Sequence, residues 1–95
     1  MNYSCYILYS RSLDKYYIGE TEDFEERLRL HNSGFFKGSF TSKASDWELY
    51  FLIKCISRNQ ARLVESHIKQ MKSRKYIENF KKYPDISEKL LLKYN

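Results

Sequence analysis

The chain is short, basic and rich in tyrosine. It has 95 residues, a net charge of +5, a pI near 9.2, and 9 tyrosines against 1 tryptophan. This length predicts one domain with one modest core. No apolar run approaches the roughly 20 residues that span a bilayer, and the start lacks the basic and apolar regions of a secretion signal. The charge favours an anionic partner such as nucleic acid, although it could equally serve solubility.

Alternating tyrosine and aliphatic residues predict a β-hairpin at the start of the chain. Its strands cover residues 3–10 and 15–19, with a polar turn between them. A period of two places Cys5 on one face of this hairpin and Tyr6 on the other. The second cysteine, Cys55, also lies in an apolar strand-like run. We expect both cysteines to be buried, reduced thiols in a cytoplasmic protein.

A helix is predicted from Thr21 or Asp23 to Gly34. An acidic first turn follows Asp23 and suits the positive end of the helix dipole, and a glycine is typical of a helix end. Arg27 and His31 fall on the stripe that should face the sheet. A polar group there indicates a functional site. The alternative is that both side chains lie at the edge of the stripe and reach water.

The segment 33–46 is rich in glycine and serine and is predicted to be a loop. It contains Lys37 and Lys43 among three phenylalanines. Basic residues interleaved with aromatic ones suit contacts with a nucleic-acid strand. A mobile loop that is held only by its phenylalanines fits the pattern as well.

The second half of the chain predicts one strand and three helices. The strand covers residues 47–56 and is apolar at nearly every position, so it could be covered on both faces. Helices are predicted over 60–73, over 75–82 and from Ser87 onward, and Pro84 separates the last two. The fold class is therefore α/β in the broad sense, of the α+β type.

Glu65 falls within the buried stripe of the helix over 60–73. Four apolar residues form this stripe: Ala61, Val64, Ile68 and Met71. A carboxylate there should be paired, protonated or bound to a metal. His67 projects elsewhere and is expected at the surface. Four cations follow Glu65 and continue past the helix end: Lys69, Lys72, Arg74 and Lys75.

Five of these residues together suit the hydrolysis of a phosphodiester bond: Tyr6, Tyr17, Arg27, His31 and Glu65. This reaction needs an activated water, positive charge at the phosphate and help for the leaving oxygen. Glu65 could hold one Mg²⁺ and Arg27 could grip the phosphate. A tyrosine is a poor base at its usual pKa of about 10, but nearby cations would favour the phenolate. The same residues could also be packing tyrosines and an ordinary ion pair.

The order of these residues resembles the GIY-YIG nuclease superfamily, and its small stand-alone bacterial members most of all. The main motif positions are Tyr6, Tyr17-Ile18-Gly19, Arg27 with His31, and Glu65. Other segments agree: His31-Asn32-Ser33-Gly34, Phe40-Thr41-Ser42, Trp47-Glu48-Leu49, and Lys69 and Lys72 after Glu65. The first motif departs from the family pattern, because Ser4-Cys5-Tyr6 keeps only its tyrosine.

The resemblance implies a three-stranded antiparallel sheet flanked by three or more helices. It implies a single domain over residues 1–95, with a core at about 3–75 and a helical extension over 76–95. It also implies a phosphodiesterase that uses one Mg²⁺, for which Mn²⁺ could substitute.

The resemblance further suggests a role for each site residue. Glu65 would bind the metal and Arg27 the phosphate. Tyr17 or Tyr6 would be the general base. We prefer Tyr17 as the base, with Tyr6 orienting water or phosphate. His31 would assist proton transfer or phosphate binding.

The expected substrate is nucleic acid, DNA in the first instance. The candidate binding residues are six cations: Lys37, Lys43, Lys69, Lys72, Arg74 and Lys75. Relatives with known targets usually have a second domain for recognition, so a protein partner could supply specificity here. The expected state is a monomer or weak dimer away from membranes. A non-catalytic nucleic-acid-binding module and a protein-interaction domain remain open as alternatives.

Overall fold

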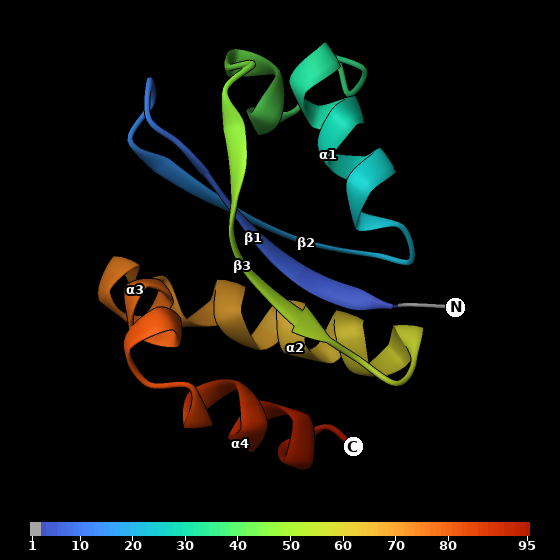
Figure 1. Cartoon of the computed structure of the whole chain (residues 1–95), viewed down its shortest axis with the longest axis vertical. Helices are drawn as coiled ribbons and strands as arrows, with labels where there is room; N and C mark the ends of the chain where they lie inside the picture. Colours follow the sequence, from blue (N-terminus) through green and yellow to red (C-terminus); the bar gives the residue numbers. More distant parts are fainter. Residues whose placement is uncertain (1–2) are drawn as a thin grey trace.

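The computed structural model describes residues 3–95. In chain order the elements are β1 (Ser4–Ser10), β2 (Lys15–Thr21), α1 (Phe24–Ser33), the short 3₁₀ helix η1 (Phe40–Lys43), β3 (Trp47–Lys54), α2 (Arg58–Met71), α3 (Arg74–Lys82) and α4 (Asp85–Lys93) (Figure 1). The strands form one antiparallel sheet in the order β2-β1-β3. The predicted fold class, a three-stranded antiparallel sheet flanked by helices, is confirmed. Within these residues no helix is long and apolar enough to cross a membrane.

β1 lies at the centre of the sheet and β2 at one edge. Tyr6 of β1 is paired with Gly19 of β2 on one side and with Leu52 of β3 on the other. The register with β3 shifts between Ile7 and Leu8. Because β2 pairs only with β1 in the described sheet, its outer edge is open to groups from the helices on both sides.

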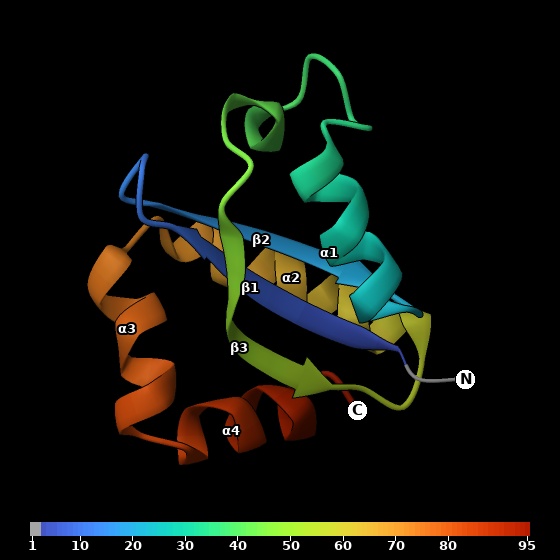
Figure 2. The same ribbon diagram turned by 45° about the horizontal axis from the view of Figure 1, so that its top comes forward.

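Helices cover both faces of the sheet. Figures 1 and 2 show α1 and η1 on one face and α2, α3 and α4 on the other. The α2 face buries an apolar core: Cys5, Ile7, Ile53, Val64, Ile68, Ile77, Phe80 and Leu90. The α1 face buries a smaller group: Tyr6, Leu8 and Trp47. The predicted alternation along β1 is thus confirmed, and each fully buried aliphatic side chain contributes about 1.5–3 kcal/mol.

The ends of α1 follow the predicted signals. The carboxylate of Asp23 accepts a hydrogen bond from the backbone N–H of Glu26 at 3.2 Å, which makes Asp23 the N-cap. Gly34 adopts a left-handed conformation with φ of 77°, and its N–H group donates back to carbonyls of the last turn. These caps fix the length of α1 and therefore the depth at which its side chains meet the sheet.

Several predicted boundaries are wrong by a few residues. β2 continues to Thr21, and β3 ends at Lys54 instead of residue 56. Part of the predicted loop, residues 40–43, forms the helical turn η1. The last helix begins at Asp85 because Pro84 occupies its N-cap, where a missing N–H group costs little.

Two side chains of α2 lie elsewhere than the helical pattern predicts. The helical pattern predicts that Met71 is buried, but it is 46% exposed. His67 was placed at the surface but is half-buried, and its Nδ1 atom lies 2.8 Å from the hydroxyl of Tyr94. This contact ties α2 to the residue that ends α4. Of the two free thiols, Cys5 is buried, as predicted, and Cys55 is only half-buried.

Candidate active site

Tyr6 and His31 meet in the buried space between β1 and α1. The Tyr6 hydroxyl lies 2.9 Å from His31 Nε2, and His31 Nδ1 lies 2.7 Å from the hydroxyl of Thr41. The Thr41 hydroxyl is in turn 3.1 Å from that of Ser39. A neutral imidazole donates through one nitrogen and accepts through the other, so both neighbours can be satisfied at once. The hydrogen-bonded chain fixes the orientation of the Tyr6 ring.

Burial keeps both members of this pair neutral. Tyr6 is 1% exposed and His31 is 3% exposed. Burial, assisted by the positive charge of Arg27, lowers the pKa of His31 to about 4. Burial is also the main reason why the pKa of Tyr6 rises well above 10. Near neutral pH the pair therefore holds a phenol and an uncharged imidazole.

Gly19 leaves room for the Tyr6 ring. The hydroxyl end of Tyr6 crosses the backbone of β2 at Gly19, and a methyl group on Gly19 would overlap it. The close approach of the Tyr6 ring therefore explains why a glycine occupies position 19. Any larger residue would push Tyr6 away from His31 or distort the edge of the sheet.

Tyr17 lies beside this pair, nearer to solvent. Its ring is half-buried and packs edge-on against His31 at 5.1 Å between ring centres. The ammonium group of Lys69 lies 5.9 Å from the centre of the Tyr17 ring. Since Lys69 belongs to α2 and His31 to α1, the open edge of β2 brings groups from both faces of the sheet to one tyrosine.

Arg27 reaches the site through an aromatic neighbour. Its guanidinium carbon lies 5.3 Å from the centre of the Phe36 ring, and that ring is 4.8 Å from His31. Arg27 is half-buried, and its charge acts on both Tyr6 and His31. The arginine therefore places a fixed positive charge next to the two buried groups.

Glu65 lies on the other side of the β2 edge, on α2. One of its carboxylate oxygens accepts a hydrogen bond from Lys69 at 2.8 Å, and its side chain is only 19% exposed. The expectation that this carboxylate would be paired is met by Lys69. The charge of Glu65 helps to raise the pKa of both Tyr6 and Cys5, so this carboxylate acts on both faces of the central strand.

Glu65 is a carboxylate in this region that could bind a divalent metal. The described part of the chain has no group of three or more His, Cys, Asp or Glu side chains that could enclose an ion. Mg²⁺ commonly keeps several waters and takes one or two carboxylates together with phosphate oxygens of the substrate. A single half-buried carboxylate such as Glu65 fits that type of site.

A second carboxylate near α2 was not anticipated from the sequence. Glu20 of β2 is half-buried and lies 3.9 Å from Arg62. Its Oε2 atom is buried and has no hydrogen-bond partner among residues 3–95. Glu20 shares a face with Ile18 and Tyr16, so the period of two along β2 could have indicated its direction.

A basic hollow adjoins the site on the α2 side. It has a volume of about 250 Å³, and its walls include Lys15, Lys69, Lys72 and Arg74. Three of these cations were predicted to bind nucleic acid, and Lys15 was missed because it lies far away in the sequence. Arg74 forms ion pairs with Asp14 at 2.5 Å and with Glu78 at 3.3 Å, so part of its charge is already neutralised.

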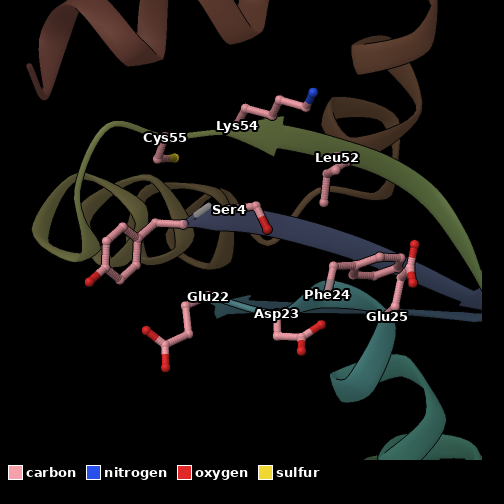
Figure 3. Close-up of a pocket in the computed structure, with 9 residues that line it drawn as sticks. Ser4, Glu22, Asp23, Phe24, Glu25, Leu52, Lys54 and Cys55 are labelled. Carbon is pink, nitrogen blue, oxygen red and sulfur yellow. The ribbon is translucent and has the colours of Figure 1, made fainter. Parts of the chain in front are cut away.

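A larger hollow, of about 350 Å³, is lined by Tyr3 but not by Tyr6 or Tyr17. Figure 3 shows that it is formed where α1 begins and β3 ends, with Leu52 and Cys55 among its walls. Its rim includes Glu22, Asp23 and Glu25. These three carboxylates outnumber the one cation of the lining, Lys54, so this hollow does not suit an anionic substrate.

The predicted site residues thus form one group and several outlying positions. Tyr6, Tyr17 and His31 are in direct contact, Arg27 joins them through Phe36, and Glu65 joins them through Lys69. Lys37 and Lys43 lie in the segment after α1, and Lys75 is exposed at the start of α3. The contact between His31 and the buried hydroxyl of Thr41 was also not predicted from the sequence.

Comparison with known proteins identifies the family of the chain. Residues 2–81 match the family model described as the GIY-YIG catalytic domain, which covers most of the 95-residue chain. No curated protein and no solved structure matches the chain significantly. The matched span includes all the candidate site residues from Tyr6 to Lys75. The chain is therefore a member of the GIY-YIG family, whose catalytic domain is of the nuclease type.

Proposed function

We propose that this protein is a metal-dependent endonuclease that hydrolyses phosphodiester bonds in DNA. The observation that supports this most is the convergence at the β2 edge of Tyr17, the Tyr6–His31 pair and the Glu65–Lys69 pair. A module that only bound nucleic acid would need the lysines but not a half-buried carboxylate next to them.

Tyr17 is the general base in this proposal. A base must reach a water molecule that also contacts the substrate. Tyr17 is half-buried, whereas Tyr6 is almost fully enclosed and is hydrogen-bonded to His31. Lys69 also brings a positive charge next to the Tyr17 ring. Burial raises the pKa of Tyr6, which suits a neutral hydrogen-bond donor better than a base.

Arg27 and Lys69 bind the scissile phosphate from opposite sides of the β2 edge. The planar guanidinium group can donate two parallel hydrogen bonds to phosphate oxygens. Negative charge accumulates on these oxygens in the transition state, so fixed cations lower the barrier. In this scheme His31 stays neutral and fixes the enclosed Tyr6 ring, which packs beside Tyr17.

Glu65 holds the metal, with Mg²⁺ as the proposed ion and Mn²⁺ as a substitute. A divalent cation bound there would polarise the phosphate and offset charge on the leaving oxygen. Glu65 also positions Lys69 through their hydrogen bond. This carboxylate therefore has two roles, in binding the ion and in orienting a cation.

Nucleic acid lies along the cationic groups on both sides of the site in this proposal. Lys15 and Lys72 would contact phosphates on the α2 side, and Lys37 and Lys43 on the α1 side. Such contacts position a strand without reading its sequence. Specificity is proposed to come from the form of the DNA or from a protein partner, and the proposed location is the cytoplasm.

Replacement of Glu65 tests the function directly. We expect Glu65→Gln to reduce cleavage of supercoiled plasmid and of a branched oligonucleotide by about 10³-fold or more, because several kcal/mol of charge stabilisation are lost. DNA binding should be unchanged or tighter, since a negative charge is removed. Nicking is measured with Mg²⁺, with Mn²⁺ and with EDTA, beside affinity by fluorescence anisotropy.

Asp85→Asn is the matched control for this experiment. Asp85 is also a helical carboxylate paired with a lysine four residues later, but it lies on α4. Its replacement should leave cleavage unchanged. Equal loss of cleavage and binding in Glu65→Gln would contradict a metal-binding role. Salt-sensitive binding without cleavage of any substrate by the wild type would favour a binding module instead.

A further inference from the structure

The segment after α1 exposes aromatic rings beside the site. Phe35 is 65% exposed and Phe40 is 37% exposed. Single exposed apolar residues are common, so exposure alone has no functional meaning. Here, however, the exposed rings flank the Tyr17 and His31 region, and neither ring adds to the two buried cores.

Phe35 is held in a defined position. Its backbone N–H group donates to the carbonyl of Leu30 at 3.2 Å, as part of the helix end at Gly34. Its ring packs edge-on against Phe36, with 5.3 Å between ring centres and 87° between ring planes. A ring that is fixed by the backbone and by a neighbour loses little entropy when it binds a partner.

Phe36 connects this exposed ring to the proposed chemistry. The centre of its ring lies 4.8 Å from that of His31 and 5.3 Å from the guanidinium carbon of Arg27. The order of contacts is therefore Phe35, Phe36, and then the residues that we place next to the scissile phosphate. A group that stacked on Phe35 would be separated only by the Phe36 ring from Arg27, the proposed phosphate ligand.

The charge around the rings suits a nucleotide. Residues 27–45 contain no Asp or Glu but include Arg27, Lys37 and Lys43. The ammonium of Lys43 lies 5.4 Å from the centre of the Phe40 ring. Aromatic faces with interspersed cations and without acidic residues complement a base and its phosphate at the same time.

We propose that Phe35 is a stacking platform for an unpaired base, and that the substrate class is therefore DNA with unpaired nucleotides next to the cleaved bond. This inference rests on the proposed function. In a continuous duplex, bases stack on one another and offer only their edges. An unpaired base in a bulge, a fork or a single strand offers its face to an aromatic ring. Phe35 distinguishes the two forms without reading sequence.

Binding under non-cleaving conditions tests this proposal. The probes are a bulged duplex with a fluorescent adenine analogue at the bulge and a fully paired duplex of the same length, both in EDTA. Phe35→Ala should weaken binding of the bulged probe about 5- to 100-fold and leave the paired duplex unaffected. Quenching of the analogue should disappear in the same variant.

Three further variants separate stacking from general apolar contact. Phe35→Trp should keep affinity and quenching, because it retains an aromatic face. Phe35→Leu should behave like Phe35→Ala. Ile56→Ala removes a side chain that is 76% exposed elsewhere on the surface and should change nothing. Since Phe35 is mostly exposed, none of these changes should impair folding.

The inference is overturned if Phe35→Ala leaves the bulged probe unaffected or weakens both probes equally. It is also overturned if sedimentation shows that Phe35→Ala only disrupts self-association, because the ring would then face a second copy of the chain. Cleavage assays distinguish this failure from that of the proposed function. A wild type that stacks the base but cuts nothing supports the platform and refutes the nuclease proposal. A wild type that cuts DNA, with no change in binding or quenching in Phe35→Ala, supports the nuclease proposal and refutes the platform.

Discussion

The two faces of the sheet bury different kinds of side chain. The α2 face is filled by aliphatic residues and Phe80, with little polar content in its core. On the α1 face the buried group includes Tyr6 and Trp47, and it is linked by hydrogen bonds to His31 and Thr41. β1 contributes side chains to both faces, because its neighbouring residues point in opposite directions. The comparison indicates a division between a stabilising face, the apolar core under α2, and a chemical face on the α1 side, which Glu65 and Lys69 of α2 approach only at the β2 edge.

The largest expected effect is on the stabilising face. Phe80→Ala removes a fully buried ring and should lower the free energy of unfolding by about 3–5 kcal/mol. Activity per folded molecule should change little, because Phe80 lies on the face away from Tyr17. Urea unfolding followed by circular dichroism, with rates corrected for the folded fraction, checks both parts. A large loss of activity in the folded fraction would show that the faces are not separable.

The pH dependence of stability should come mainly from the chemical face. Burial lowers the pKa of His31 to about 4, against about 6.5 in an unfolded chain. Between these values the unfolded chain binds a proton that the folded chain does not, so stability falls as the pH drops. The expected loss between pH 7.5 and pH 5 is about 2 kcal/mol.

His31→Gln should flatten this pH dependence, and urea unfolding at several pH values measures the slope. His67 is the control on the other face, since burial also lowers its pKa. His67→Gln should flatten the slope less, because that side chain is more exposed than His31. Equal slopes in the wild type and in His31→Gln would contradict a buried neutral His31.

A smaller effect is expected when one hydroxyl is removed from the chemical face. Tyr6→Phe leaves His31 Nε2 without its partner at 2.9 Å and should cost about 1–2 kcal/mol. Tyr50→Phe removes a more exposed hydroxyl that donates to the Glu78 carbonyl at 3.3 Å, and it should cost less than about 0.5 kcal/mol. Thermal unfolding of the two variants gives the comparison. Similar costs would argue against a special buried pair at Tyr6.

Much of the fold could be predicted because it depends on local patterns. The period of two along β1, the cap at Asp23 and the glycine after α1 each determine structure within a few residues. Contacts between side chains far apart in the sequence were harder to predict. His67 was expected at the surface because the pattern of α2 alone does not show that Tyr94 packs back on it.

The candidate site was predictable as a set of residue types but not as a geometry. The sequence indicated Tyr6, His31 and Glu65 through their unusual positions, yet it did not show that Tyr6 would be enclosed and bonded to His31. Thr41 was missed as the partner of His31, because a hydroxyl in a glycine- and serine-rich segment gives no local signal. Lys15 was missed because only folding brings it beside Lys72.

Tyr16 and Tyr17 offer the most direct test of the division between the faces. They are neighbours on β2, but Tyr16 packs toward α3, with Arg74 at 5.1 Å from its ring centre, whereas Tyr17 packs against His31. The measurement is the single-turnover cleavage rate of Tyr17→Phe and Tyr16→Phe with saturating Mg²⁺. We predict that Tyr17→Phe lowers the rate about 10²- to 10⁴-fold and that Tyr16→Phe stays within about twofold of the wild type. An undiminished rate in Tyr17→Phe, or equal losses in both variants, would contradict the assignment of the chemistry to the α1 face and the β2 edge.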